Sequence, residues 1–241
     1  MKIIIPMAGR GSRLADWQEN VPKPLILIAG KPMIEWALES LKGIPATEVV
    51  FVLLAEHEKL FGIKQKIKRI IDLPIKFNII NEVTEGQLCT VLTARHFIIP
   101  EEDILIASID TLVISDLANH LRTLSDESHG LISVANMPGD KWSFARTNAD
   151  GNVIEVAEKK RISDNASTGI YYFRSGREFL EMADKIIAKR EKTRGEYYVI
   201  PVYQKYIERG WKVGVSKASE VWDMGNPDAI IEFEKHFKGN L

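Results

Sequence analysis

The segment from Lys2 to Arg13 constrains the fold more than any other part of the chain. Ile3, Ile4 and Ile5 form a short β-branched run without polar alternation, which is typical of a strand covered on both faces. Pro6 cannot donate to a sheet ladder, so the strand is expected to end there. Gly9 and Gly11 follow at once, and glycine lets the backbone adopt positive φ and approach a ligand closely. The segment predicts a buried strand that leads into a glycine-rich loop, at the edge where α/β sheets hold their ligands.

Cations accompany this loop. Arg10 and Arg13 flank the glycines, and Lys23 lies between two prolines that stiffen its own loop. Backbone amides and fixed cations at the end of a central strand form a site for polyphosphates. The loop is neither a P-loop, because no Gly-Lys-Ser/Thr follows, nor a dinucleotide fingerprint, because Leu14 replaces its third glycine. A simple turn with solvated cations remains the alternative.

Composition excludes several classes of protein. The chain has 241 residues, a net charge of −1 and one cysteine, Cys89, so neither a nucleic-acid partner nor an internal disulfide is expected. No apolar run approaches the roughly 20 residues of a membrane span, and the first residues do not resemble a signal peptide. We expect a cytoplasmic protein with no membrane partner. A homo-oligomer stays open, with Trp17, Trp36 and Trp142 in segments predicted as surface loops or interfaces.

The order of predicted elements indicates an α/β fold with a mainly parallel sheet flanked by helices. Strands are predicted over 2–5, 48–54, 75–80 and 103–109, and helices over 32–41, 56–71 and 87–94. The second half, from about residue 126, is predicted to be antiparallel or mixed, because Asp150-Gly151 separates two short alternating runs and predicts an antiparallel hairpin. A strand over 166–173, a helix over 178–188, a helix that ends at 208, a strand over 211–215 and a helix over 228–237 complete it. A further helix is predicted over 115–124, capped by Ser115.

Three positions are chemically suggestive without any comparison. Asp110 follows a buried strand, which makes it a candidate for Mg²⁺ or a simple turn cap. Gln87, at the start of a helix behind Gly86, offers both a donor and an acceptor to a ligand, or is merely solvated. Lys159 ends the predicted hairpin and is either functional or an exposed lysine; Lys160 would face the other way.

Taken together, these motifs resemble the sugar-phosphate nucleotidylyltransferases, also called NDP-sugar pyrophosphorylases. The resemblance rests on Pro6 to Arg13, Pro22-Lys23-Pro24-Leu25, Glu158-Lys159, Thr168-Gly169 and the run Trp222 to Pro227, in order along nearly the whole chain. It implies one nucleotidyltransferase domain over 1–241, with a triphosphate-binding half (about 1–125) and an acceptor-binding half (about 126–241). It also implies a Rossmann-like fold with a small antiparallel acceptor-binding part.

The same resemblance implies the site residues. Arg13 and Lys23 would be catalytic, and Asp110 and Asp223 would bind Mg²⁺. The triphosphate would lie on Ala8, Gly9, Gly11 and Ser12, with Gln87 at the base, and the acceptor on Glu158, Lys159, Thr168, Gly169 and Glu196. The implied reaction joins a nucleoside triphosphate to a sugar 1-phosphate, for surface-polysaccharide precursors, and releases pyrophosphate. A pyrimidine base is favoured on family grounds only.

Two alternatives remain: transfer to a non-sugar phosphate such as phosphocholine, and a non-catalytic nucleotide-binding regulatory module. A glycosyltransferase is disfavoured, because Ser108-Ile109-Asp110 carries one carboxylate where such enzymes use Asp-x-Asp. The expected attacking group, a phosphate monoester with a second pKa of about 6, is already ionised at neutral pH and needs no histidine base.

Overall fold

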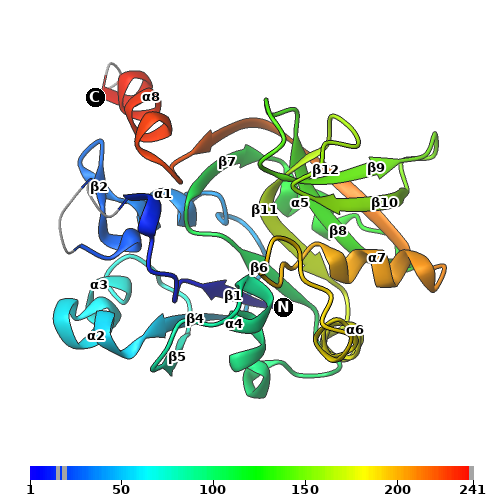
Figure 1. Ribbon diagram of the computed structural model, residues 1–241, viewed down its shortest axis with the longest axis horizontal. Coiled ribbons are helices and arrows are strands. Elements are labelled where there is room, and N and C mark those ends of the chain that lie inside the picture. The colour runs from blue at the N-terminus through cyan, green and yellow to red at the C-terminus, as the bar shows by residue number, and fades with distance from the viewer. Residues whose placement is uncertain (15–16, 18–20, 239–241) are drawn as a thin grey trace.

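One mixed sheet of ten strands runs through the part of the chain that the computed structural model describes, residues 1–14, 17 and 21–238 (Figure 1). Its main path has the order β5-β4-β1-β6-β11-β8-β12-β7, and the β9–β10 hairpin joins it through β11. The strands of the first half are β1 (Lys2–Pro6), β4 (Glu48–Leu54), β5 (Ile75–Ile80), β6 (Ile104–Ala107) and β7 (Thr111–Ser115). Those of the second half are β8 (Ser128–Ala135), β9 (Ser143–Thr147), β10 (Val153–Glu158), β11 (Ala166–Phe173) and β12 (Lys212–Asp223). Outside it, β2 (Leu27–Ile28) pairs with β3 (Lys31–Pro32).

The first four strands along the path are parallel, as the sequence predicts. β1 pairs with β4 on one side and with β6 on the other, and β5 extends the sheet beyond β4. The chain therefore builds outward from β1 and then returns across it to form β6. In open α/β sheets such a reversal leaves a crevice at the carboxyl ends of the two strands, where ligands bind.

The second half continues this sheet. β11 is antiparallel to β6 on one side and to β8 on the other, so it joins the two halves through backbone hydrogen bonds. The predicted hairpin is confirmed: β9 and β10 are antiparallel, and Gly151 in their turn has a φ of +82°. The sheet is thus mixed: four parallel strands lie at one end, and β8 and β12 form a further parallel pair beyond β11.

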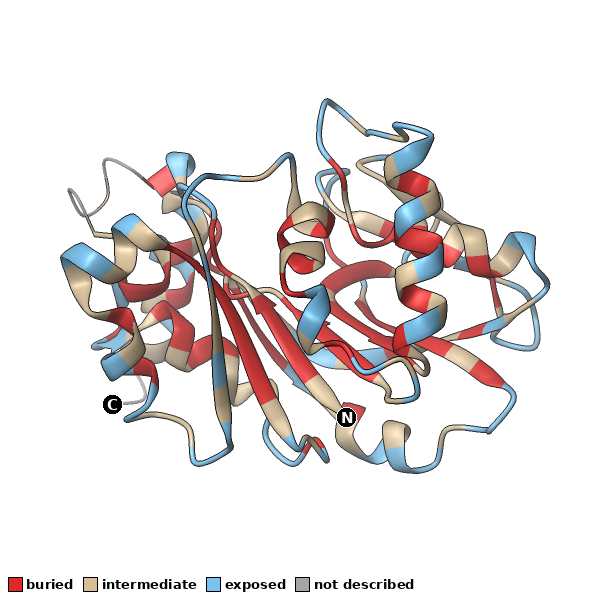
Figure 2. Cartoon of the chain, turned by 90° about the horizontal axis from the view of Figure 1, so that it is seen from below, coloured by how far each residue is buried: buried red, intermediate tan, exposed pale blue. Residues whose placement is uncertain are grey.

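Helices cover both faces of the sheet, and the strands between them are buried (Figure 2). Ile3 and Ile5 pack into one apolar cluster and Ile4 into the other, which explains the unbroken apolar run of β1. One face carries α1 (Met33–Glu39), α2 (Ala55–Phe61), α3 (Ile63–Ile67), α5 (Leu117–Arg122) and α8 (Pro227–Lys238). The other carries α4 (Gln87–Thr93), α6 (Gly176–Ala188) and α7 (Pro201–Glu208). No helix in the described ranges is long and apolar enough to cross a membrane.

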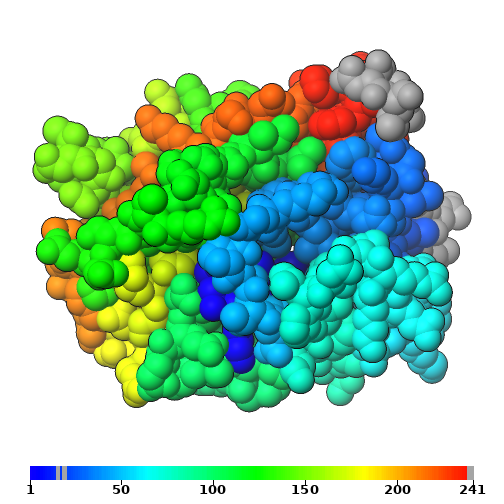
Figure 3. Space-filling view, turned by 180° about the vertical axis from the view of Figure 1, so that it is seen from behind, coloured from blue at the N-terminus to red at the C-terminus, as the bar shows by residue number. Residues whose placement is uncertain are grey.

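The closing helix α8 returns to the first half of the chain. In Figure 3 it lies beside the blue N-terminal segments, at the opposite end of the molecule from the β9–β10 turn. Phe233 of α8 packs edge-on against Trp36 of α1, with 5.1 Å between ring centroids. Trp36 is 8% exposed, so the prediction of a surface loop or interface is wrong for this residue.

Three predicted elements differ from the structure. The helix predicted over 56–71 is two helices, because Gly62 has a φ of +57° between them, and Leu60 is exposed instead of packed inward. Residues 111–115 form the unpredicted strand β7, so the next helix starts later and Ser115 is not its N-cap. β12 runs on to Asp223, because its second part pairs with β7.

Candidate active site

A pocket of about 570 Å³ lies where β1 and β6 end, at the crevice that the strand order predicts. Two loops form much of its wall, residues 6–14 after β1 and residues 108–110 after β6. Lys23, Gly86, Gln87, Glu196, Tyr198 and Gly225 approach it from other segments. The pocket thus brings together residues from both halves of the sequence.

The glycine loop forms part of the pocket wall: Ala8, Gly9, Gly11 and Ser12, the residues predicted to bind the triphosphate, all line the pocket. Gly11 has a φ of +64°, and a Cβ there would lie only 2.9 Å from Cβ of Lys23. Glycine at this position therefore lets the loop pack against the segment that carries Lys23, which is the 3₁₀ helix η2 (Lys23–Leu25). A second 3₁₀ helix, η1 (Ser12–Leu14), buries Leu14 and leaves Arg13 exposed over the pocket.

Asp110 and Asp223 converge although 112 residues lie between them in the sequence. β12 pairs with β7 so that Asp223 is opposite Thr111, and the amide of Met224 donates to the carbonyl of Asp110 over 2.8 Å. A Cβ on Gly225 would lie 2.9 Å from Oδ1 of Asp223, 3.4 Å from Oδ2 of Asp110 and 3.9 Å from Nη1 of Arg13. Two carboxylates and a guanidinium thus surround one point that a side chain at 225 would fill.

Each of these carboxylates is paired with a lysine. Nζ of Lys23 lies 2.5 Å from Oδ2 of Asp110, and both side chains are mostly buried. Burial opposes ionisation of Asp110, but Lys23, with a smaller effect from Arg13, outweighs it and holds the pKa of that carboxyl below its usual range. Nζ of Lys141 lies 2.5 Å from Oδ2 of Asp223. Sequence reasoning predicted Lys23 here and missed Lys141.

Gln87 lies at the opposite wall of the pocket, where α4 begins. Its Nε2 donates to Oγ of Ser108 over 3.1 Å, which fixes the amide beside the loop that carries Asp110. Gly86 has a φ of +134°, and a Cβ there would meet the carbonyl oxygen of Tyr197 at 2.4 Å. The close approach predicted for Gly86 is therefore to backbone: the amide of Tyr197 donates to Glu85, and its carbonyl accepts from Leu88.

This backbone pairing places Glu196 and Tyr198 on the pocket wall. The Tyr198 hydroxyl donates to Oε2 of Glu196 over 2.7 Å and accepts a hydrogen bond from Nζ of Lys159, which also sits over the Tyr198 ring. Burial, with Glu196 beside it, raises the pKa of this phenol. Sequence reasoning named Glu196 here and missed Tyr198, whose place depends on the pairing of Tyr197 with the distant residues Glu85 and Leu88.

Lys159 reaches this site by leaving its strand. β10 ends at Glu158, and Lys159 has a φ of +54°, so strand alternation does not decide where it and Lys160 point. Its amide donates to the carbonyl of Trp142 over 2.8 Å. A non-glycine residue held in the left-handed region is often found at a functional site.

The remaining predicted acceptor residues, Glu158, Thr168 and Gly169, do not line this pocket, and each contacts a different serine. Glu158 accepts a hydrogen bond from Ser143, and burial raises the pKa of its carboxyl. Thr168 is 2% exposed and its hydroxyl bonds to Ser133, so its side chain is turned into the protein. Gly169 has a φ of +86° and lies against Ser108, where a Cβ would be 2.7 Å from Oγ. Thr168 and Gly169 thus shape the wall through packing.

The donor set suits a hard divalent cation shared with phosphate. Among the described residues, no group of three or more His, Cys, Asp or Glu side chains is arranged to hold a metal. Two carboxylates that face one gap do fit Mg²⁺, which proteins usually bind through one or two carboxylates together with substrate phosphates. Gly225 keeps that gap open, since a Cβ would lie within it.

The charges of the pocket define what it can do. Arg10, Arg13 and Lys23 line it. Lys141 pairs with Asp223, and Lys159 bonds to Tyr198. None of the described residues that line it is a histidine. Fixed cations and backbone amides around a cavity of this size can bind a polyphosphate and offset charge that moves between phosphates.

Comparisons with known proteins agree with this geometry. A sequence model of the nucleotidyl transferase family matches residues 2–239. The bifunctional protein GlmU of Thermotoga petrophila is 30% identical over 211 residues, which cover 83% of this chain and 43% of that protein. GlmU of Methanococcus maripaludis is 28% identical over 251 residues, covering all of this chain and 55% of that protein. The chain thus spans about half the length of these curated relatives.

Solved structures share the fold. A nucleoside-diphosphate-sugar pyrophosphorylase from Vibrio cholerae superposes with a TM-score of 0.83 at 28% identity, covering 97% of this chain and 99% of that one. A UDP-glucose pyrophosphorylase complexed with UDP-glucose superposes with a TM-score of 0.79 at 18% identity, covering 100% and 99%. At that lower identity the likeness concerns the fold alone.

Proposed function

The chain belongs to the nucleotidyl transferase family, and from that premise we propose that it transfers a nucleotidyl group from a nucleoside triphosphate to a sugar 1-phosphate, with release of pyrophosphate. One observation carries the proposal. Asp110, Asp223 and Arg13 meet around Gly225, which lines the same pocket as the glycine loop. A triphosphate on that loop would bring its phosphates to the only place in the pocket where both carboxylates and a guanidinium converge among the described residues.

In this reaction an oxygen of the acceptor phosphate attacks the α-phosphorus, and the bond to the leaving pyrophosphate breaks in line. The attacking oxygen is already ionised, since the second pKa of a phosphate monoester is about 6. The protein's task is to align two anions and offset their charge. The backbone of Gly9 to Ser12 would hold the triphosphate, Arg13 would offset charge on the pyrophosphate, and Lys23 would offset charge at the α-phosphate.

Lys159 and Glu158 are proposed to hold the acceptor. The ammonium of Lys159 bonds to Tyr198, which lines the pocket. Glu158, the residue before Lys159, is bonded to Ser143. The ammonium would bind the attacking phosphate, and the carboxylates of Glu158 and Glu196 would accept from hydroxyl groups of the acceptor. Glu196 is already fixed by Tyr198.

Asp110 and Asp223 would hold a divalent cation, proposed as Mg²⁺. Such an ion, when bound, polarises phosphoryl oxygens and reduces the repulsion between them. Gln87 would contact the base, with a pyrimidine proposed as its preferred partner, and synthesis of a surface-polysaccharide precursor in the cytoplasm is the proposed role.

The test is pyrophosphate release with Mg²⁺, in which CTP, UTP, dTTP, GTP and ATP are each combined with sugar 1-phosphates, phosphocholine and inositol 1-phosphate. We expect release from one pair that needs both partners, and we expect it to disappear in Asp110→Ala. A sugar 1-phosphate as partner supports the proposal. Release with only a non-sugar phosphate would overturn the acceptor class, and silence from folded protein that still binds a nucleotide would favour the regulatory module.

A further inference from the structure

Lys141 pairs with one of the two carboxylates that the proposed function assigns to the divalent cation. Its Nζ lies 2.5 Å from Oδ2 of Asp223, which also accepts a hydrogen bond from Nδ2 of Asn226 over 3.3 Å, while the amide of Gly225 donates to Oδ1 over 2.8 Å. No other ammonium or guanidinium group of the described residues forms an ion pair with Asp223. The sequence gives no hint of this contact, because Lys141 and Asp223 lie 82 residues apart.

The two lysines of the site differ in how firmly they are held. The side chain of Lys23 is 14% exposed, and that of Lys141 is 48% exposed. Lys23 is fixed beneath the glycine loop, where its Cβ meets Gly11. Lys141 rests on the Trp142 ring, with 4.4 Å between Nζ and the ring centroid, and reaches Asp223 from solvent. An exposed lysine of this kind can leave its carboxylate at little cost.

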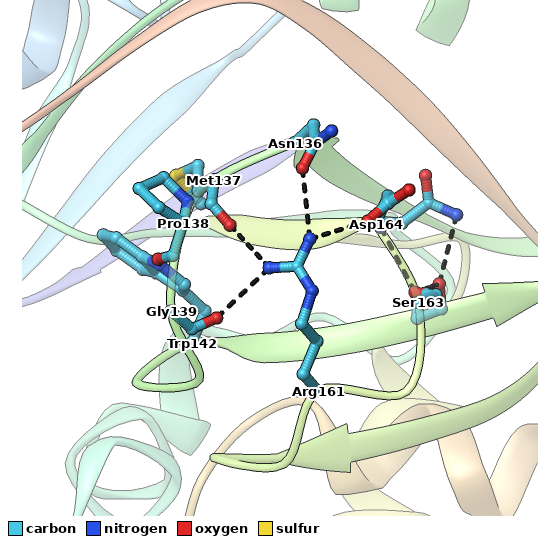
Figure 4. A network of polar contacts seen from close by, with 10 residues as sticks. Asn136, Met137, Pro138, Gly139, Trp142, Arg161, Ser163 and Asp164 are labelled. Carbon is cyan, nitrogen blue, oxygen red and sulfur yellow. Dashed lines mark hydrogen bonds and ion pairs between the residues drawn. The ribbon is translucent and has the colours of Figure 1, made fainter.

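Arg161 holds the segment that presents Lys141, as Figure 4 shows. Its Nη1 donates to the carbonyls of Met137 and Gly139 over 2.8 and 3.2 Å, and its Nη2 donates to Oδ1 of Asn136 over 3.2 Å. Nη2 also pairs with Asp164 over 2.6 Å, and Nε1 of Trp142 donates to the carbonyl of Pro138 over 2.9 Å. The planar guanidinium therefore fixes a turn that otherwise has no helix or strand.

The same segment runs beside the proposed acceptor residues. The carbonyl of Trp142 accepts from the amide of Lys159, and Ser143 bonds to the carboxylate of Glu158. Lys141 is therefore placed between Asp223 on one side and the residues proposed to hold the acceptor on the other.

We propose that Lys141 is an exchangeable counter-ion: it neutralises Asp223 while no divalent cation is bound, is displaced by the cation, and then contributes positive charge to the acceptor phosphate. Arg161 is the positioning residue that presents it. The inference rests on the proposed function and names a residue for it that the family motifs of the sequence do not include.

The physical reason is electrostatic competition. The carboxylate of Asp223 can be neutralised by the Lys141 ammonium or by a divalent cation, and the two positive charges repel each other at close range. Asp110 and Asp223 without cations would in turn repel each other across the Gly225 gap. A lysine on a fixed turn reduces the repulsion between the two carboxylates while no cation is bound. After the cation displaces it, the lysine stays near the site, because the turn holds its backbone in place.

The first test measures cation binding without turnover, by titrating the protein with Mn²⁺ and following free Mn²⁺ by electron paramagnetic resonance. Lys141→Met removes the charge and keeps most of the side chain's length. We expect it to bind Mn²⁺ about three- to tenfold more tightly than the wild type, because the competing ammonium is gone. Lys160→Met, at an exposed lysine of the next loop, is the matched control and should leave the affinity unchanged.

Unchanged or weaker Mn²⁺ binding by Lys141→Met overturns the competition. The second readout is pyrophosphate release, in which the variant should show an acceptor KM raised about tenfold and an unchanged KM for the triphosphate. An unchanged acceptor KM overturns the role at the acceptor phosphate. Failure of the wild type to release pyrophosphate with any pair would count against the proposed function, whereas the Mn²⁺ comparison would still decide the competition.

The role of Arg161 is tested by combining variants. Arg161→Met frees the turn, so Mn²⁺ should bind more tightly than to the wild type, and Lys141→Met/Arg161→Met should bind it no more tightly than Lys141→Met alone. A purely structural role would lower thermal stability without moving Mn²⁺ affinity in this direction. Additive effects in the double variant would overturn the assignment of Arg161 as the positioning residue.

Discussion

Arg13 is the residue at which charge and geometry combine most clearly. It is exposed above the pocket, it follows the glycine loop, and its Nη1 lies 3.9 Å from the point that both carboxylates approach. The sequence predicted Arg13 and Lys23 because loop glycines and stiffening prolines are visible in a linear pattern. Lys141 and Tyr198 were not predicted, because their partners are brought close only by the pairing of distant segments.

Arg13→Ala is therefore expected to lower kcat/KM about 10²- to 10³-fold, the range for loss of one preorganised electrostatic contact. The measurement is pyrophosphate release with the substrate pair found in the panel. Arg69→Ala, an exposed arginine outside the pocket, should retain wild-type turnover. Near wild-type kcat/KM in a folded Arg13→Ala protein would contradict the role assigned to this guanidinium.

Glu158 predicts a pH dependence of acceptor binding. Burial is the largest influence on this carboxyl and raises its pKa, against smaller opposing effects of Ser143 and Lys159. A raised pKa means that Glu158 takes up a proton at a higher pH than an ordinary glutamate, and the protonated form is a poorer acceptor for hydroxyl groups. The KM for the acceptor should therefore rise as pH falls below neutral.

Glu158→Gln separates this effect from titration of the acceptor phosphate itself. The glutamine variant should have a higher acceptor KM at neutral pH and a shallower rise toward acid, because only the phosphate still titrates. Parallel pH profiles for the two proteins would show that Glu158 does not titrate in the acceptor complex.

At the scale of elements, the strands were easier to predict than the helices. β1 and β4 are apolar runs buried on both faces, and such runs are distinct in sequence. The helix at 56–71 failed because an apolar periodicity continued across Gly62, whose left-handed conformation depends on the backbone. β7 failed because its pairing partner is the far end of β12, more than 100 residues later.

Gly86 precedes α4 and lies against the backbone of Tyr197, so its substitution tests how these two segments are joined. A Cβ in Gly86→Ala would meet the Tyr197 carbonyl oxygen at 2.4 Å, and the φ of +134° adds backbone strain. We expect a loss of about 2–4 kcal/mol in the free energy of unfolding, from strain together with the lost pairing of residues 85–88 with Tyr197. Urea denaturation measures it.

Gly62→Ala is the matched control for this substitution. Its φ is also positive, but no atom lies within 4 Å of its Cβ position, so only the conformational cost of about 1 kcal/mol applies. Equal losses in the two variants would mean that contact with Tyr197 does not govern Gly86. A larger loss in Gly86→Ala, accompanied by weaker nucleotide binding, would agree with the link to Glu196 and Tyr198.

At the scale of the whole molecule, the two predicted halves share one sheet. The order of elements predicted the fold class, and Asp150-Gly151 predicted the hairpin. Neither pattern could show that β11 would lie between β6 and β8. That place depends on long-range pairing and on side chains such as Phe173, which is fully buried and stacks on Tyr203 with 4.5 Å between ring centroids. The pairing of β7 with the end of β12 is a second link between the halves, and it brings Asp223 beside Asp110.

A shared sheet predicts that the halves unfold together. If β11 holds β6 and β8 in one cooperative unit, amides of β4 and of β8 should lose protection at the same urea concentration, measured by pulsed hydrogen exchange with mass spectrometry. Phe173→Ala should lower both midpoints equally, by about 3–5 kcal/mol in the free energy of unfolding, because it leaves a cavity where the halves meet. Ile231→Ala, at an exposed position of α8, should leave both midpoints nearly unchanged. Separate midpoints in the wild type would mean that the two halves of the chain are independent units, and the convergence of Asp110 and Asp223 would then depend on their docking.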